Sequence, residues 1–303
     1  IMAKLKNING HFVESDYENA LIAFLEREGW QYLFGASIAR ANRKEVLNMD
    51  DLLQFLKDNH KNVKDEELQR IADNVRLVGA DSDFATLHKV YKWMVNGVPA
   101  VDKDGKPTTV NLIDFSCLDH PQKENTNIFR VVNQFTVEYM NNGAVKNRRP
   151  DVLLYVNGIE LKNPADANAT IEDAWEQINI RYWRDIPGLL HYCPLACISD
   201  GVKTRLGTVR TPYEHFYAWR RVENGDRVST MPFDELETMV RGVYRPERFL
   251  EIFRDYVYFQ DENFDSDEKE IVCRYPQFFA TRLLRESVIK SVKTKSGKGG
   301  TYF

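Results

Sequence analysis

The stretch at residues 148–164, RRPDVLLYVNGIELKNP, decides the fold that this sequence predicts. Residues 152–156 form an apolar run with strand preferences, and Asn157-Gly158 is a strong signal for a two-residue hairpin turn. Residues 159–162 are then expected to return as the second strand. The sequence therefore predicts a hairpin preceded by a single carboxylate, Asp151.

Two carboxylates of this hairpin have the chemistry of metal ligands. We expect Asp151 and Glu160 to face each other across the two strands. Hydrolysis of a phosphodiester commonly uses a divalent cation, and magnesium prefers carboxylate oxygens. Strand alternation predicts that Lys162 projects to the same side as Glu160, where an ammonium can orient water or stabilise a phosphate. A solvated cross-strand salt bridge, with Asp151 capping a turn, explains the spacing equally well.

A helix is predicted after the hairpin. Thr170 and Asp173 have the spacing of a capping pair, and Pro187 limits the other end. An apolar face follows at helical spacing and consists of Ile171, Ala174, Trp175, Ile178 and Tyr182. Gln177 and Arg181, four residues apart, flank that face and could bond the site residues or a DNA phosphate. The alternative is that these residues have only a structural role, as a buried apolar stripe with a polar border.

The order Asp151, Glu160-x-Lys162, Gln177-x3-Arg181-Tyr182 resembles the PD-(D/E)xK nucleases of the RecB-like branch. Their marks are a Pro-Asp pair, an ExK strand and a QxxxY helix. Five stretches also look like the amino-terminal part of the restriction (R) subunit of type I restriction-modification enzymes. They are VVNQFTVEY (131–139), NRRPD (147–151), ELKNPADANATIEDAW (160–175), ISDG (198–201) and TPYEHFYAWR (211–220).

The resemblance implies a mixed α/β fold, a restriction-endonuclease-like sheet flanked by helices, and magnesium-dependent cleavage of double-stranded DNA. It implies that the full-length protein translocates DNA with ATP and assembles with methyltransferase and specificity subunits. By resemblance, Asp151 and Glu160 are metal ligands and Lys162 positions water or phosphate. The supporting residues implied for the site or the DNA are Gln177, Tyr182, Arg181, Arg148 and Arg149.

A glutamate on the first helix approaches the metal in RecB-like nucleases, and Glu18 is the matching position. Ser15 and Glu18 also have the spacing of a capping box, with Gly29 at the helix end. Capping is the simpler role for Glu18.

The resemblance predicts a nuclease domain at residues 1–230, with its core at about 110–222. Residues 231–303 are expected to form a helical connector and the beginning of a RecA-like motor domain. Gln277 would contact adenine by resemblance. The glycine-rich residues 296–300 lack the Lys-Ser/Thr pair of a phosphate-binding loop, so we expect no ATPase activity from this chain.

One departure from the family concerns the hairpin. The usual pattern resembles NGLPLVVIELK, whereas Ile159 follows Gly158 directly in this sequence. A hairpin this short puts the relative placement of Asp151 and Glu160 in doubt.

Composition is consistent with a folded, cytoplasmic fragment. The 303 residues are 43% hydrophobic, and no apolar run approaches the roughly 20 residues that a membrane span needs. The first ten residues lack the apolar stretch of a signal peptide. The net charge of −4 is unusual for a free-standing DNA-binding domain, although arginines near Asp151 could form a basic rim.

Residues from about 14 to 75 and from 232 to 260 are predicted to be mainly helical, and residues 110–222 to alternate strands with the helix after Thr170. Two other function classes stay open. The chain could be a non-catalytic assembly and DNA-docking module with a degenerate nuclease site. It could also be a stand-alone RecB-like repair nuclease, which the helicase-like carboxyl-terminal stretch argues against.

Overall fold

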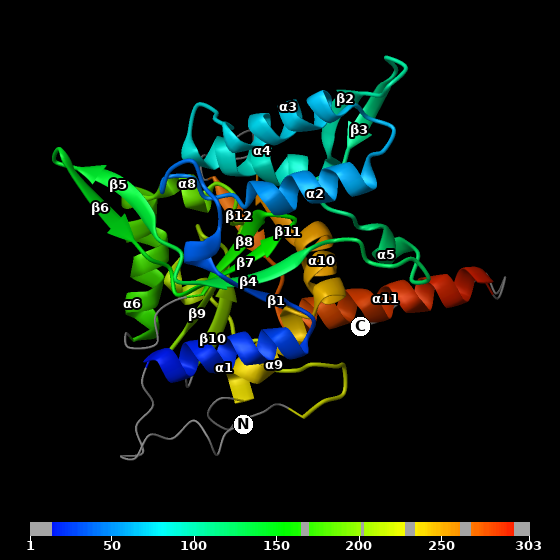
Figure 1. Ribbon diagram of the computed structural model, residues 1–303. Helices are drawn as coiled ribbons and strands as arrows, with labels where there is room; N and C mark the ends of the chain where they lie inside the picture. Colours follow the sequence, from blue (N-terminus) through cyan, green and yellow to red (C-terminus); the bar gives the residue numbers. More distant parts are fainter. Residues whose placement is uncertain (1–13, 165–169, 201–202, 228–233, 261–267, 294–303) are drawn as a thin grey trace.

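A six-stranded mixed sheet forms the centre of the computed structural model, which describes residues 14–164, 170–200, 203–227, 234–260 and 268–293 (Figure 1). The strand order is β1-β4-β7-β8-β9-β10, and β1 pairs with β4, and β8 with β9, in parallel. The other three pairings are antiparallel. The strands are β1 (Gln31–Phe34), β4 (Phe129–Asn133), β7 (Val152–Val156), β8 (Ile159–Pro164), β9 (Leu195–Ser199) and β10 (Thr204–Gly207). Every residue of β7 and β9 is buried, and apart from Ser199 at the end of β9 the two strands are continuous apolar runs.

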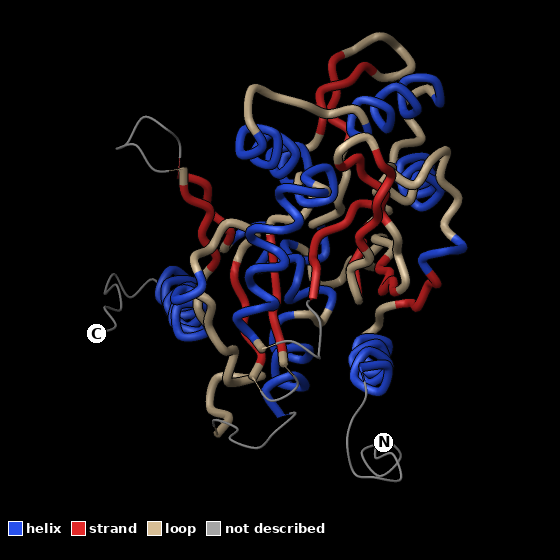
Figure 2. Tube along the Cα trace, turned by 90° about the vertical axis from the view of Figure 1, so that its left-hand side faces the viewer, coloured by secondary structure: helices blue, strands red, loops and turns tan. Residues whose placement is uncertain are grey.

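Helices lie on both sides of these strands (Figure 2). α1 (Glu14–Arg27) packs against β1 and β4, and α6 (Ile171–Glu176) packs against β9. α6 continues through a π-helical segment, η3 (Gln177–Tyr182), into α7 (Trp183–Asp185), and α8 (Pro187–Leu190) follows. The mixed α/β arrangement expected from the sequence is therefore confirmed.

A helical unit is inserted between β1 and β4, and apart from α5 it lies at the top of Figure 1. It contains α2 (Met49–Asn59), α3 (Asp65–Arg76), α4 (Asp83–Asn96), the two-stranded sheet of β2 (Val98–Val101) and β3 (Pro107–Val110), and the short α5 (Ser116–Asp119). Asn48 and Ser82 cap α2 and α4 with their side chains. The Arg130 guanidinium on β4 donates to both carboxyl oxygens of Asp51, at 2.9 and 3.1 Å, and so ties this unit to the sheet.

The carboxyl-terminal part begins with α9 (Asp234–Val243) and α10 (Pro246–Asp255), and α9 contacts α1. The Trp30 indole donates to the Tyr244 carbonyl at 2.6 Å, joining the start of β1 to the segment between these helices. β11 (Val257–Gln260) and β12 (Lys269–Val272) form a separate sheet, and α11 (Tyr275–Lys293) follows.

The helical predictions were correct for α1, α2, α3, α9 and α10 but wrong for β1 and β11, which lie in the ranges expected to be helical. A last hairpin, β5 (Val137–Asn141) and β6 (Ala144–Arg148), projects from the molecule at the left of Figure 1. The 3-10 turns are η2 (Gly35–Ser37) and η4 (Tyr213–His215). Within the residues that the structure describes, no helix has the length and apolar character needed to cross a membrane.

Candidate functional site

Asp151 and Glu18 lie at the same end of the central sheet. Asp151 immediately precedes β7, whose first residue pairs with Asn133 at the end of β4. Only three residues separate α1 from β1, so α1 runs back along the sheet it contacts and its first turns reach that end. Glu18 Oε1 is buried and has no hydrogen-bond partner among the described residues. Such an atom lacks the compensation that burial of a carboxylate normally requires.

Glu18 has a different environment from the one its capping role predicts. Ser15 lies within α1, which includes Glu14, so it is not the residue that precedes the helix. The predicted capping box at the helix start is therefore wrong, and the side chain of Ser15 lies outside the described part of the structure. The other end agrees with the prediction, because Gly29, two residues after the end of the helix, has a φ of +107°.

The β7–β8 turn is the predicted one. Asn157 and Gly158 have φ values of +52° and +76°, as a type I′ hairpin turn requires. The turn packs against the helical unit. Asn157 Nδ2 donates to the Leu112 carbonyl at 2.9 Å, and the Asn48 amide donates to the Gly158 carbonyl at 2.8 Å. A Cβ at Gly158 would lie 2.0 Å from the Asn48 carbonyl oxygen.

The register of the hairpin does not place Asp151 across from Glu160, and this corrects the expectation from sequence. Glu160 pairs with Tyr155, next to the turn, and Lys162 pairs with Leu154. Because Asp151 lies three residues before Leu154, Glu160 falls five positions short of the point opposite Asp151. Because Glu160 is opposite Tyr155, four residues from Asp151 along the chain, the offset along the strand is about 13 Å at a rise of about 3.3 Å per residue.

A bulge accounts for part of this register. The pairing shifts between Leu154 and Tyr155, which leaves Leu161 as the extra residue on β8. The strict alternation that placed Glu160 and Lys162 on one side is therefore interrupted in the backbone. The side chains of residues 160–164 lie outside the described part of the structure.

The helix after the hairpin begins as predicted. The Thr170 hydroxyl accepts from the Asp173 amide, and the Asp173 carboxylate accepts from the Thr170 amide at 2.9 Å, so the capping box is complete. The hydrogen bond from the Thr170 hydroxyl lowers the pKa of Asp173. Four of the five predicted apolar positions are buried, and Trp175 is partly buried: the buried ones are Ile171, Ala174, Ile178 and Tyr182.

The π-helical segment changes the pairing within this helix. A π turn brings positions i and i+5 together, and Gln177 Nε2 donates to the Tyr182 hydroxyl at 2.6 Å. Arg181 instead pairs with Glu176 at 3.5 Å. The predicted hydrogen bonds of Gln177 and Arg181 to site residues or to a DNA phosphate stay predictions.

The candidate DNA-contacting arginines differ in availability. Arg148 Nε donates to Asp185 at 2.8 Å and its Nη2 contacts the same carboxylate, so the Arg148 guanidinium is held against Asp185. Arg149 is exposed, and Arg181 is about half exposed. Of the three, Arg149 and Arg181 offer their guanidinium groups to solvent.

Asp185 is a residue of this region that the sequence analysis missed. Its side chain is buried and bonds both Arg184 and Arg148, at 2.7 and 2.8 Å. Hydrogen bonds from Arg184 lower its pKa; burial opposes this and the Arg148 guanidinium adds to it, so the pKa lies well below its ordinary value. The available signal was an acid in the last turn of a helix, where the helix dipole disfavours negative charge unless a cation balances it.

A metal site is not complete in the described part of the chain. No three His, Cys, Asp or Glu side chains there converge as ligands of one ion. Asp151 and Glu18 carry oxygens of the type that magnesium prefers, but the register holds Glu160 away from them. These residues as arranged do not fit the two-carboxylate site expected from Asp151 and Glu160.

The predicted nucleotide residues lie at the other end of the chain. Gln277 is exposed in the first turn of α11, and its Oε1 accepts from the Arg274 amide at 2.8 Å. Its contact with adenine stays a prediction. The glycine-rich residues 296–300 lie outside the described residues.

Comparison with known proteins gives the family. Residues 11–215 match the model of the type I restriction enzyme R protein N terminus, so this chain belongs to that family. A putative type I restriction enzyme endonuclease subunit of Methanocaldococcus jannaschii, MjaIXP, is 28% identical over 92% of the chain. The HindI endonuclease subunit of Haemophilus influenzae is 26% identical over 94% of the chain. The chain covers 28% and 27% of the lengths of these relatives.

Proposed function

We propose that this chain is the amino-terminal nuclease portion of a type I restriction enzyme R subunit and that its site hydrolyses phosphodiester bonds of double-stranded DNA. The observation that carries the proposal is that the series Asp151, Glu160, Lys162, Gln177 and Tyr182 lies within the matched family region. The names of the relatives as endonuclease subunits support the same reaction.

Magnesium is the proposed cofactor, with Asp151 as a ligand and Glu18 as a second candidate, and Glu160 would join them only in a hairpin register that brings it level with Asp151. When bound, the ion would neutralise phosphate charge and activate water. Lys162 would position water or phosphate, while Gln177 and Tyr182 hold the site helix through their 2.6 Å hydrogen bond. Arg149 and Arg181 would meet DNA phosphates, and Arg148 would keep the strand before Asp151 in place through Asp185.

The hairpin register favours a second candidate function. An offset of five positions between Asp151 and Glu160 separates the two proposed ligands by far more than the roughly 2 Å ligand distances of magnesium allow. A domain with this register would dock DNA or other subunits without cutting. We keep this docking module as the alternative.

The proposal extends to the whole protein. The full-length subunit would translocate DNA with ATP, assemble with methyltransferase and specificity subunits, and cut unmodified DNA. Gln277 would contact adenine there. These statements rest on the family and on the names of relatives about three and a half times as long as the matched chain.

The decisive experiment compares wild type, Asp151→Ala and Lys162→Ala in the full-length subunit assembled with its partners. Loss of cleavage in both variants, with ATP hydrolysis retained, supports the nuclease proposal. Undiminished cleavage in either variant overturns the site assignment. Absence of cleavage by the wild type in magnesium and in manganese, with assembly intact, supports the docking module.

A further inference from the structure

The β5–β6 hairpin projects from the body of the molecule at the left of Figure 1, on the side where α1 begins. Val137 at its base is 3% exposed, whereas Met140 and Val145 near its tip are 55% and 62% exposed. Residues 142–147 are all exposed. The outer half of the hairpin, including two apolar side chains, therefore lies in solvent.

The hairpin is held in shape at its turn and at its base. Asn142 and Gly143 have φ values of +52° and +78°, as a type I′ turn of two residues requires. At the base, Arg148 Nε donates to Asp185 at 2.8 Å, and the Arg148 guanidinium lies 5.7 Å from the centroid of the Tyr139 ring. A partner would therefore meet an element whose conformation is already set.

The two faces of the hairpin differ in chemistry near the tip. Met140 and Val145 are directly opposite each other in the register, so their side chains share one face and form an apolar patch. Lys146 is opposite Tyr139, and strand alternation places it on the other face. The hairpin thus presents apolar contact on one face and a long cationic side chain on the other.

The free charges of the hairpin and the residue after it are positive. Among the residues that the structure describes, no carboxylate lies within ion-pairing distance of Lys146 or Arg149. The one carboxylate of the hairpin, Glu138, pairs with Arg43 at 3.7 Å. A surface with unbalanced cations attracts a polyanion such as DNA, whose phosphates they neutralise.

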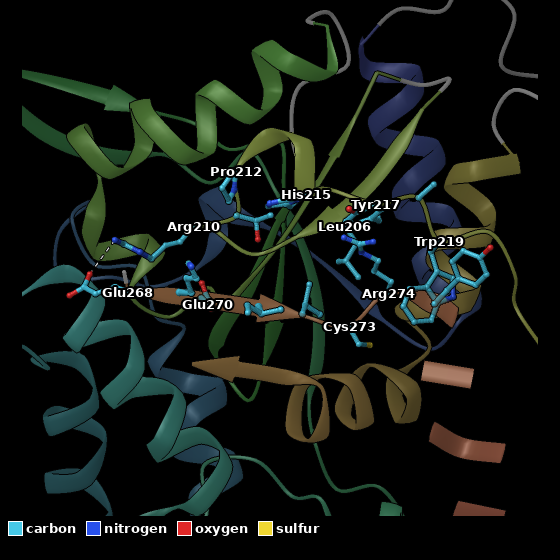
Figure 3. Close-up of a pocket in the computed structure, with 16 residues that line it drawn as sticks. Leu206, Arg210, Pro212, His215, Tyr217, Trp219, Glu268, Glu270, Cys273 and Arg274 are labelled. Atoms are coloured by element: carbon cyan, nitrogen blue, oxygen red, sulfur yellow. Dashed lines mark hydrogen bonds and ion pairs between the residues drawn. The ribbon is translucent and has the colours of Figure 1, made fainter. Parts of the chain in front are cut away.

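Cations at two other places that could bind a ligand are already balanced or engaged. The turn of the β2–β3 hairpin, residues 102–106, carries two aspartates and two lysines. In a cavity of about 950 Å³ beside β12, Arg210 pairs with Glu268 at 3.3 Å, and the Arg274 guanidinium lies 3.4 Å from the centroid of the Tyr217 ring (Figure 3). The comparison favours the β5–β6 hairpin as the surface for an anionic partner.

The dimensions of the hairpin fit one groove of DNA. Its two strands lie about 4.8 Å apart, and side chains add to that width. The major groove is about 12 Å wide and admits a two-stranded β-ribbon, whereas the minor groove is only about 6 Å wide. Because β6 leads through Arg149 to Asp151, DNA held by this hairpin would lie beside the candidate site.

We propose that the β5–β6 hairpin enters the major groove of double-stranded DNA. Met140 and Val145 contact base edges, and Lys146 contacts a phosphate at the side of the groove. Double-stranded DNA is the substrate in the proposed function, on which this assignment rests. The hairpin is the surface that holds this substrate next to Asp151.

The test measures binding of the 303-residue chain to a fluorescein-labelled duplex of about 20 base pairs by anisotropy, in EDTA so that metal-dependent cleavage does not occur. Met140→Glu and Val145→Glu bring a carboxylate against the DNA, and each should weaken binding at least tenfold. Val101→Glu, at a 47% exposed valine of the β2–β3 hairpin, is the matched control and should bind like the wild type. Circular dichroism melting checks that all three variants fold.

A second measurement tests the phosphate contact and the groove. Lys146→Gln should reduce the slope of log affinity against log salt concentration by about one, because one phosphate contact is lost. Lys103→Gln, in the exposed turn of the β2–β3 hairpin, should leave the slope unchanged. Methyl green, which binds in the major groove, should displace the chain from the duplex, whereas distamycin, which occupies the minor groove, should not.

Four results would overturn the proposal. They are no duplex binding at about 50 mM salt, equal affinity of Met140→Glu, Val145→Glu and the wild type, an unchanged salt slope in Lys146→Gln, and displacement by distamycin alone. Loss of assembly with partner subunits, in hairpin variants that still bind DNA normally, would assign the hairpin to a protein partner and overturn the proposal as well.

Failure of the nuclease proposal gives a different result. A chain that binds DNA through the hairpin in EDTA but does not cut in magnesium upholds the hairpin assignment and contradicts the nuclease proposal. Cleavage that Met140→Glu and Val145→Glu leave at the wild-type rate, with unchanged DNA affinity, does the reverse.

Discussion

The β7–β8 hairpin and the helix that follows it form the two halves of the candidate site. They differ in how far the local sequence determines the position of each residue. The capping box at Thr170 is set by residues three positions apart, so local chemistry determines where the helix begins. In the hairpin, the turn is equally local, but the partner of each residue depends on how many residues follow the turn. The hairpin can therefore keep the same residue types while a change in its length alters which residues lie opposite each other.

The largest effect is expected when the hairpin is lengthened to the usual family pattern, because this tests whether register alone separates the two carboxylates. Insertion of Leu-Pro-Leu-Val-Val between Gly158 and Ile159 should move the Glu160 side chain to the level of Asp151, because the offset is five positions. We expect magnesium or manganese binding, measured by titration calorimetry, to appear or to strengthen at least tenfold. The same insertion combined with Asp151→Ala should bind no better than the wild type.

The insertion also has a clear contrary outcome. If the inserted chain folds, by circular dichroism, and metal affinity does not change, then register is not what limits the site. Strong metal binding by the unmodified chain would likewise show that Asp151 and Glu18 suffice.

A second test concerns the turn itself. Gly158→Ala should lower the free energy of unfolding by about 3 kcal/mol or more, because left-handed strain adds to a contact at 2.0 Å with the Asn48 carbonyl oxygen. Gly143→Ala is the matched control: its φ of +78° is similar, but no atom lies within 4 Å of the new Cβ. It should cost only about 1–2 kcal/mol in urea unfolding. Equal losses of unfolding free energy in the two variants would mean that the close contact of Gly158 with Asn48, at the start of α2, does not add to the cost.

A third test joins the two halves of the site. Asp185→Asn should lower the free energy of unfolding by about 2 kcal/mol at pH 7, since it weakens charge-assisted bonds to Arg148 and Arg184. The folded-state pKa of Asp185 is depressed, so its stabilisation is fully present above the unfolded pKa of about 3.9 and is lost as the pH falls through the folded pKa.

The difference between wild type and Asp185→Asn should therefore shrink when unfolding is measured below about pH 4. Asp65→Asn, at an exposed ion pair with Lys57, should change stability by less than about 0.5 kcal/mol. A difference that stays constant down to pH 2 would contradict the role of the Asp185 charge.

The smallest expected effect belongs to the helix start. Thr170→Ala should cost about 1 kcal/mol of unfolding free energy, since it removes the hydroxyl that accepts from the Asp173 amide. Thr238→Ala, inside α9, provides a threonine that caps no helix. Thermal unfolding that ranks the two variants equally would show that the capping box does not stabilise the site helix.

The sequence predicted correctly those elements whose turn, strand or helix signals are contained in a single stretch of about ten residues. The Asn157-Gly158 turn, the strand before it and the apolar face after Thr170 are all of this kind. β1, β11 and β12 have only four residues each, too few for periodicity to separate strand from helix, and they form through distant partners. The partnership of Arg148 with Asp185, 37 residues apart, is invisible without the fold.

Within the site, sequence could identify candidate carboxylates but not their distances. The short hairpin was recognisable as a departure from the family pattern. Its consequence for Glu160 required the pairing with Tyr155, and the bulge at Leu161 has no signature in the residues themselves. The hydrogen bond from Gln177 to Tyr182 required knowledge of the π turn.

The π-helical segment also bears on how this region tolerates insertions and deletions during evolution. A π turn holds one residue more than an α turn, so the segment at Gln177–Tyr182 absorbs a surplus residue within itself and leaves the residues on either side in phase. The β7–β8 pair accommodates one extra residue in its bulge at Leu161, and any larger change in length is passed to every later residue. Drift in chain length is therefore expected to leave the helix half of the site intact long after the hairpin half has lost its alignment.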